Sequence, residues 1–350
     1  GSITWANDNK TIFYSKKEDK TLRVNKIYRH QLSSDIENDI LVFEEKDDQF
    51  STGIYKTKSQ KFLIIASKST LTSEMRFLDA NNPNEEFQLF TKREKNHEYS
   101  VNHFGDDFYI LTNSENSKNF RVMRCSVYDT SISSWEEIIP HNKEILIEDI
   151  ELFDEYFVIS EREKGLVKFK IKKWKTNDEF YLPFEGETYN ASLGINLDFK
   201  SKKLRYNFTS LTNPSTVIEF DMSKKSKNIL KTQEVVDKNF KSSNYESKRV
   251  WAISHDGIQV PISIVKRKET VYSENTPLLL YGYGSYGITI DPYFSSTRLS
   301  LLDRGFVFAI AHVRGSEYLG RDWYESGKLL KKKNTFLDFI SSAKYLISEN

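Results

Sequence analysis

Short apolar segments and polar turns alternate along the first two thirds of the chain, in two recurring forms. In the first form a polar turn precedes a run of apolar and aromatic residues, at 11–14, 62–65, 108–111, 156–159 and 204–208. The second form follows at a similar offset and alternates apolar with polar residues, at 26–29, 74–78, 120–124, 166–171 and 216–220. Alternation of this kind is typical of half-exposed strands. The pattern therefore predicts a repeated unit built from strands.

The spacing of this unit narrows the fold class. Tyr14, Ile65, Leu111, Ile159 and Phe208 occupy equivalent positions, and the steps between them are 51, 46, 48 and 49 residues. A period of roughly 40 to 50 residues made of short strands is typical of β-propeller blades. The alternative is a β-sandwich in which the spacing is accidental. Five repeats and almost no helix signal favour a mainly β fold, with an incomplete β-propeller over residues 1–245.

Residues 246–350 follow a different pattern. An Asp-Gly turn between two apolar runs predicts an antiparallel hairpin. The apolar run at 277–281, after the hairpin, predicts a strand buried on both faces, because neither face of this strand would carry polar side chains. The elements expected in order are the hairpin strands 249–254 and 258–265, a strand at 277–281, a helix at 294–302, a strand at 306–311 and an amphipathic helix at 335–347. This order predicts the beginning of a mixed α/β sheet.

Composition excludes several classes of function. The 51 Lys and Arg residues balance the 50 Asp and Glu residues, so we expect neither a nucleic-acid partner nor a membrane-surface partner. No apolar run approaches the roughly 20 residues that a membrane helix needs. Cys125 is the only cysteine, which excludes an internal disulfide and favours the cytoplasm. The chain opens inside a strand-and-turn pattern, which suggests that an N-terminal segment is missing.

The candidate metal and acid motifs of the propeller region are better explained as structural. His97 and His103 lie close in sequence, but no third ligand stands at zinc-like spacing, so we expect no metal site. The acid pairs 44–45 and 47–48 consist of adjacent residues, which point opposite ways on a strand, so a turn or solvated loop is favoured.

The run 282–287 matches the Gly-x-Gly-x-x-Gly dinucleotide fingerprint and follows a predicted strand. Pro292 stands where the phosphate-binding helix should run, and the next strand ends at Arg314 without an acid for a ribose. We therefore expect no nucleotide and no other cofactor. No Gly-x-Ser-x-Gly nucleophile motif occurs in the sequence, so the chain alone does not support serine catalysis.

Four segments make the sequence recognisable. They resemble the oligopeptidase B branch of the prolyl oligopeptidase family, and the resemblance extends back through residues 5–8, 44–48 and 97–100, so that it covers essentially the whole chain. The segments are 280–287 (LYGYGSYG), 300–307 (SLLDRGFV), 312–315 (HVRG) and 323–336 (WYESGKLLKKKNTF).

The resemblance implies a seven-bladed propeller that caps an α/β-hydrolase domain, with the Ser, Asp and His of a catalytic triad in the C-terminal portion of the protein. We therefore expect 1–245 to be a partial propeller and 246–350 the N-terminal part of the hydrolase sheet. The nucleophile would come shortly after Asn350, so the chain would be an internal fragment that is inactive alone.

The resemblance also assigns two site residues. Tyr283 matches a tyrosine whose hydroxyl donates to the oxyanion hole, although it could instead be a packing residue. Asp291 matches an acid that helps to bind a basic substrate side chain next to the cleaved bond, but Tyr293 replaces a second acid there, which leaves the preference at this subsite open. The implied partner is a short basic peptide, cut after Lys or Arg, with the propeller gating access. The rival interpretation is a non-catalytic propeller that binds peptides or proteins.

Overall fold

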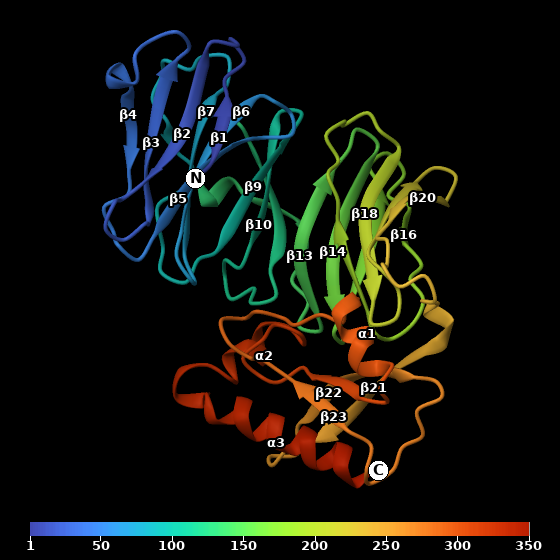
Figure 1. The fold of residues 1–350 in the computed structure, drawn as a ribbon. Helices are drawn as coiled ribbons and strands as arrows, with labels where there is room; N and C mark the ends of the chain where they lie inside the picture. The colour runs from blue at the N-terminus through green and yellow to red at the C-terminus, as the bar shows by residue number, and fades with distance from the viewer. Residues whose placement is uncertain (350) are drawn as a thin grey trace. The chain divides into compact units, whose positions relative to one another are not determined.

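A computed structural model describes residues 1–349, and they form two compact units (Figure 1). The first unit consists of Gly1–Asn142 together with Leu197–Phe199. The second consists of Lys143–Asn196 and of the described residues from Lys200 onward. The second unit combines two propeller-like sheets with the mixed sheet, so the predicted domain boundary near residue 245 stays a prediction.

The first unit contains three four-stranded antiparallel sheets, each with its strands in chain order. Two single turns of 3-10 helix, η1 and η2, lead into the last strands of the first and third sheets. The elements are β1 (Ile3–Trp5), β2 (Thr11–Lys17), β3 (Val24–Gln31), η1 (Ile36–Asn38), β4 (Ile40–Glu44), β5 (Ser51–Lys56), β6 (Phe62–Lys68), β7 (Ser73–Asp79), β8 (Gln88–Leu89), β9 (Tyr99–Phe104), β10 (Asp107–Thr112), β11 (Arg121–Ser126), η2 (Ile132–Ser134) and β12 (Glu136–Ile139).

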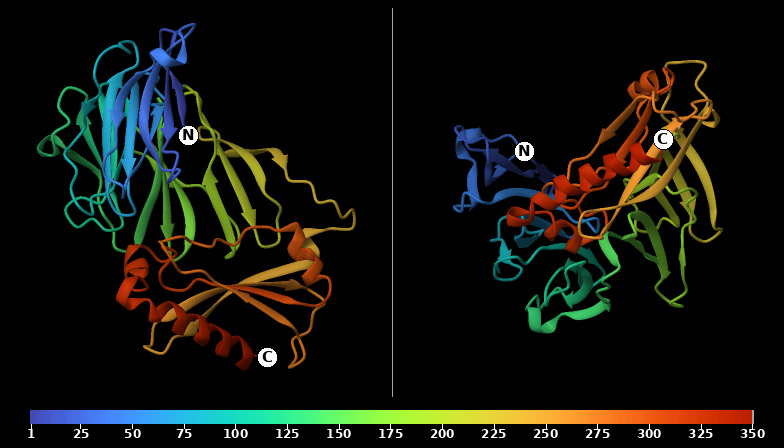
Figure 2. Two further views of the ribbon diagram at one scale, coloured as in Figure 1. Left: turned by 60° about the vertical axis from the view of Figure 1, so that its left-hand side comes forward. Right: turned by 90° about the horizontal axis from the view of Figure 1, so that it is seen from below.

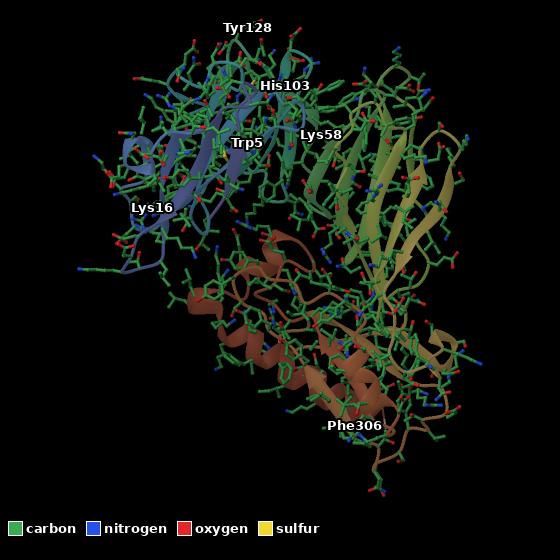
Figure 3. The ribbon with its side chains drawn as sticks, turned by 45° about the horizontal axis from the view of Figure 1, so that its top comes forward. Trp5, Lys16, Lys58, His103, Tyr128 and Phe306 are labelled. Carbon is green, nitrogen blue, oxygen red and sulfur yellow. The ribbon has the colours of Figure 1, made fainter. Side chains whose placement is uncertain are left out.

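Aromatic side chains fill the space between the second and third of these sheets. Phe77 meets Phe62 and Phe108 edge-to-face, Phe62 and Phe108 are tilted at 47°, and the ring centroids are 4.9–5.7 Å apart. This geometry adds stabilisation beyond the area that the rings bury. His103 packs edge-on against Phe62 and Phe108 and bonds to Ser59, and burial lowers its pKa to about 4. Figure 3 labels His103, which is buried, and Tyr128, whose side chain is 88% exposed.

The second unit begins with two further antiparallel four-stranded sheets. Their strands are β13 (Ile145–Leu152), β14 (Tyr156–Glu163), β15 (Leu166–Lys173), β16 (Glu179–Tyr181), β17 (Tyr189–Leu193), β18 (Lys203–Ser210), β19 (Thr216–Asp221) and β20 (Ser226–Thr232). One apolar core joins the two sheets, with Phe153, Phe169 and Leu204 fully buried at its centre. On the middle strands of both sheets, alternate side chains point toward this core.

The five sheets confirm the predicted repeat. The aromatic segments of the sequence are the second strands β2, β6, β10, β14 and β18, and the alternating segments are the third strands β3, β7, β11, β15 and β19. A four-stranded antiparallel sheet with strands in chain order is the blade of a β-propeller. The mainly β fold class is therefore confirmed. The separate four-stranded sheets favour propeller blades over the sandwich alternative.

The remaining elements form a mixed sheet in the order β21-β22-β24-β23. The hairpin pairs antiparallel with β24, and β23 adds to β24 in parallel. Helix α3 packs on β21, β22 and β24, and Figure 2 shows it running along one face of this sheet. The elements are η3 (Ser242–Asn244), β21 (Tyr245–Ile253), β22 (Gln259–Arg267), β23 (Leu278–Tyr281), α1 (Ser296–Leu302), β24 (Val307–Ala311), α2 (Arg321–Glu325), η4 (Leu329–Lys331) and α3 (Lys333–Ser348).

One expectation for this sheet is wrong. All five residues of β24 are buried, as predicted, but β23 is not buried on both faces, since Leu278, Leu279 and Tyr281 are 38%, 44% and 45% exposed. The physical reason is the strand order, which puts β24 between two neighbours and β23 at the edge of the described sheet. The short helix α2 was not predicted at all.

Gly165 provides a test of the packing in the second unit. It occupies the tip of the β14–β15 hairpin at φ +82°, and a Cβ there would lie 2.1 Å from the ring of Tyr318. Gly257 has the same φ of +82°, but a Cβ would meet nothing within 4 Å. We expect Gly257→Ala to lower the free energy of unfolding by about 1–2 kcal/mol, the cost of left-handed backbone for a residue with a Cβ. Gly165→Ala should cost roughly 1–3 kcal/mol more, because it also overpacks the core.

Denaturant unfolding of the two variants beside the parent protein measures this difference. Equal destabilisation by both substitutions would contradict the close packing of Gly165 on Tyr318.

Candidate active site

The glycine-tyrosine turn directly follows β23 and has a strained backbone. Gly284, Tyr286 and Gly287 all have positive φ, at 66°, 57° and 73°. A Cβ on Gly284 would lie 2.5 Å from Thr335 Cγ2 and 2.8 Å from the Arg314 carbonyl oxygen. Only glycine fits this position, both for its φ and for its surroundings. The turn is therefore held in one conformation by its neighbours.

Two polar contacts fix the turn further. The backbone N–H of Gly287 donates to the carbonyl of Gly315 at 3.1 Å. The ammonium group of Lys332 donates to the Gly284 carbonyl and, at 2.7 Å, to Ser285 Oγ. Burial lowers the pKa of Lys332. These bonds hold the residues that follow Tyr283, which is 43% exposed and makes no hydrogen bond to another residue within 1–349.

A buried ion-pair network supports the loop that packs against this turn. Arg314 follows β24 and donates to Asp338 of α3 through its backbone N–H, Nε and Nη2, at 3.0, 2.9 and 2.6 Å. Its Nη1 also donates to Asp256 at 2.6 Å, and Ser254 Oγ donates to Asp338 at 2.7 Å. Asp338 is completely buried. The hydrogen bond to Asp338 is the largest cause of the raised pKa of Arg314.

Sequence reasoning missed the supporting residues Lys332, Arg314 and Asp338. Lys332 belongs to a lysine run that reads as a solvated face, and Asp338 lies on the predicted helix among apolar residues. A signal for Asp338 does exist, because an acid inside the apolar stripe of an amphipathic helix must find a partner when it is buried.

The second predicted site residue, Asp291, is already paired. Both of its carboxylate oxygens accept from Arg162 of β14, Oδ1 from Nη1 at 2.7 Å and Oδ2 from Nη2 at 3.0 Å. Arg162 Nε donates to Glu148 of β13 at 2.6 Å. Although burial opposes the charge, Asp291 and Glu148 raise the pKa of Arg162. No hydrogen bond or ion pair joins Tyr283 to Asp291 within the described chain.

Two family models match the chain. The model of the prolyl oligopeptidase N-terminal β-propeller domain matches residues 1–233. The chain belongs to the prolyl oligopeptidase family. The family's own model also matches residues 292–350, which include Arg314, Lys332 and Asp338. The resemblance read from the sequence is confirmed, and the family is one of serine peptidases.

Named members of the family match the chain over almost its whole length. Dipeptidyl aminopeptidase BI of Pseudoxanthomonas mexicana is 37% identical over 99% of this chain and 48% of its own length. Protease 2 of Moraxella lacunata is 35% identical over 100% of this chain and 50% of its own. The structure of oligopeptidase B from Trypanosoma brucei with covalently bound antipain is 34% identical, with a TM-score of 0.93 over 99% of this chain and 50% of that one. The chain thus spans about half the length of the curated relatives it matches.

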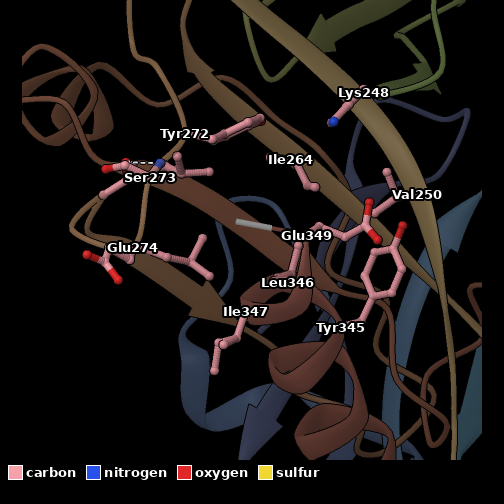
Figure 4. A pocket seen from close by; sticks show the side chains of 13 residues that line it. Lys248, Val250, Ile264, Tyr272, Ser273, Glu274, Tyr345, Leu346, Ile347 and Glu349 are labelled. Atoms are coloured by element: carbon pink, nitrogen blue, oxygen red, sulfur yellow. Dashed lines mark hydrogen bonds between the residues drawn. The ribbon is translucent and has the colours of Figure 1, made fainter.

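A separate pocket of about 330 Å³ lies beside the end of α3 (Figure 4). Its walls are apolar, with Lys248, Glu274 and Glu349 among the polar lining residues. Neither Tyr283 nor Asp291 lines it, so it is not the site that the sequence predicts. The apolar lining residues are Val250, Ile264, Leu278, Val307, Leu346 and Ile347.

Metal-binding groups and membrane-spanning helices are two other kinds of feature that residues 1–349 could contain. Residues 1–349 contain no group of three or more His, Cys, Asp or Glu side chains placed to hold a metal ion. Among the helices of this part of the chain, none is both long and apolar enough to cross a membrane. His97 bonds through Nε2 to Thr112, and His103 bonds through Nδ1 to Ser59, so each has a structural partner.

The buried network predicts a large effect of Asp338. We expect Asp338→Ala to lower the free energy of unfolding by about 3–5 kcal/mol, because it removes a buried carboxylate that compensates the charge of Arg314. Glu269→Ala is the matched control, since Glu269 also accepts from an arginine at 2.6 Å but is exposed. It should leave the unfolding midpoint unchanged. Similar urea midpoints for both variants would contradict the stabilising role of the network.

Proposed function

We propose that the protein to which this chain belongs is a serine peptidase that cleaves short peptides after lysine or arginine. The observation that carries the proposal is the rigid turn at 282–287, which presents a half-exposed Tyr283 beside a buried network. Membership of a serine peptidase family supports the reaction type. The choice of basic peptides follows from what the sequence resemblance to the oligopeptidase B branch implies.

The proposed reaction is acyl transfer to a serine that a histidine activates. The sequence contains no Gly-x-Ser-x-Gly, so we place the nucleophile and its partners in the half of the protein outside this chain. Tyr283 would donate its hydroxyl hydrogen to the oxyanion of the tetrahedral intermediate, alongside a backbone N–H next to the nucleophile. A donor that is already held in place costs no reorganisation when the charge develops. Lys332 would act through the turn, as a positioning residue.

We further propose that the propeller limits the size of the substrate. Peptides that pass the propeller would have to be short and unfolded, as expected for an enzyme that cleaves oligopeptides. The second unit supports a coupling of the two parts, because Arg162 and Gly165 of one blade contact Asp291 and Tyr318 from the segments that follow β23 and β24. We expect a cytoplasmic location, no cofactor and no nucleic-acid or membrane partner.

A second function has a specific observation in its favour. The relative that is 37% identical is named a dipeptidyl aminopeptidase, which by its name removes two residues from a free N-terminus. Peptides with a blocked N-terminus separate the two activities, since only an endopeptidase can cleave them. Cleavage of blocked peptides after Lys or Arg by the full-length protein supports the proposal. Cleavage of free peptides alone supports the aminopeptidase, and binding without cleavage supports a non-catalytic propeller module.

Tyr283→Phe tests the oxyanion role in the full-length protein. The change removes only the hydroxyl group, and we expect it to lower kcat by roughly 10²–10³-fold, on the order of 2.7–4 kcal/mol, as does the loss of one oxyanion donor elsewhere. Tyr286→Phe is the matched control, because Tyr286 lies in the same turn and is 74% exposed. Its kcat should match that of the parent. A Tyr283→Phe enzyme with full kcat on an arginine peptide would exclude this role.

A further inference from the structure

Asp291 does not present a free carboxylate. Arg162 binds both of its oxygens in a two-point arrangement, at 2.7 and 3.0 Å. Paired contacts of this kind are among the stronger hydrogen bonds in proteins, because both partners are charged and the guanidinium plane matches the carboxylate. The Asp291 side chain is 17% exposed, and that of Arg162 is 5% exposed.

Arg162 cannot easily turn away from Asp291. Its Nε donates to Glu148, and its Nη1 also donates to the carbonyl of Gly165 at 3.2 Å. The hairpin that carries it is fixed in turn, because the ring of Tyr318 packs on Gly165 and Arg249 donates to the carbonyl of Lys164 at 2.7 Å. A buried arginine with three partners loses all of them if its side chain moves. The ion pair is therefore part of the resting structure.

The pairing decides what charge a substrate meets. A free aspartate attracts a lysine or arginine side chain, whereas the charge of Asp291 is opposed by the fixed guanidinium of Arg162, which Asp291 shares with Glu148. A basic side chain would have to share the Asp291 carboxylate with Arg162, whose positive charge repels it, and Tyr293 supplies no second acid to help it. Neutral side chains meet no such competition.

We propose that Arg162 determines the specificity of the Asp291 subsite: by occupying both carboxylate oxygens, it allows neutral residues next to the cleaved bond as readily as basic ones. The inference rests on the proposed function and on the expectation, implied by the family resemblance, that Asp291 lies where the substrate residue next to the cleaved bond binds. It assigns to a propeller residue the control of a subsite in the peptidase part of the protein.

The test uses the full-length protein and two blocked peptides that end in the same arginine at the cleaved bond. One peptide has arginine before it and the other has alanine, and the ratio of their kcat/KM values is the preference. Asp291→Asn, Arg162→Met and the double variant complete a mutant cycle. Arg93→Met is the control, because Arg93 also bridges two acids, Glu45 at 2.5 Å and Glu74 at 3.4 Å, but belongs to the first compact unit.

We expect the parent and Asp291→Asn to prefer arginine by less than about threefold, and Arg162→Met to raise the preference about tenfold or more, because it frees the Asp291 charge. The double variant should lose this gain, and Arg93→Met should behave as the parent. If Arg162→Met does not fold, Arg162→Gln replaces it in the cycle, and a folded Arg162 variant whose preference stays at the parent level would overturn the inference.

A parent enzyme that prefers arginine strongly, with a preference that Asp291→Asn abolishes, would overturn the inference. Failure of the proposed function has a different signature, namely that the parent cleaves neither blocked peptide.

Discussion

Three backbone segments meet at Gly284, Gly315 and Gly327 with no room for a side chain between them. A Cβ on Gly315 would lie 2.0 Å from the Gly284 carbonyl oxygen, and one on Gly327 would lie 2.2 Å from the Gly315 nitrogen. This close approach joins the end of β23, the end of β24 and the segment before α3. Everything proposed for Tyr283 depends on it, because a hydroxyl donor is useful only when its backbone cannot move. The Arg314 network then keeps the three segments from separating.

Much of the fold could be predicted from the sequence, because burial leaves a periodic signal. The second and third strands of each blade carry alternating or apolar side chains, and they were recognised at every repeat. The fourth strands left little trace: β20 is exposed along its whole length, and β8 has only two residues. The edge strand β23 shows the opposite failure, since Leu278 and Leu279 look like a buried strand although the described chain does not cover them. Hydrophobicity indicates that a strand needs a cover, but not what covers it.

The candidate site was predictable only in part. The glycine pattern at 282–287 pointed to a special turn, and the family resemblance gave Tyr283 and Asp291 their expected roles. Neither could indicate that Arg162, 129 residues before Asp291, would occupy its carboxylate. Long-range ion pairs have no local pattern, because each partner only needs to be polar and well placed. The charge state of a subsite is therefore a property of the fold and not of the motif.

The strand order of the mixed sheet has a consequence for how the protein is made. Each blade pairs neighbours along the chain, so it can form soon after its residues leave the ribosome. Strand β23 cannot, because its only partner in the described sheet is β24, which begins at Val307. Until then its leucines and the turn of Tyr283 have no fixed place. During synthesis the propeller strands can therefore form before the candidate site does. The apolar residues of β23 stay unpaired until β24 has been made.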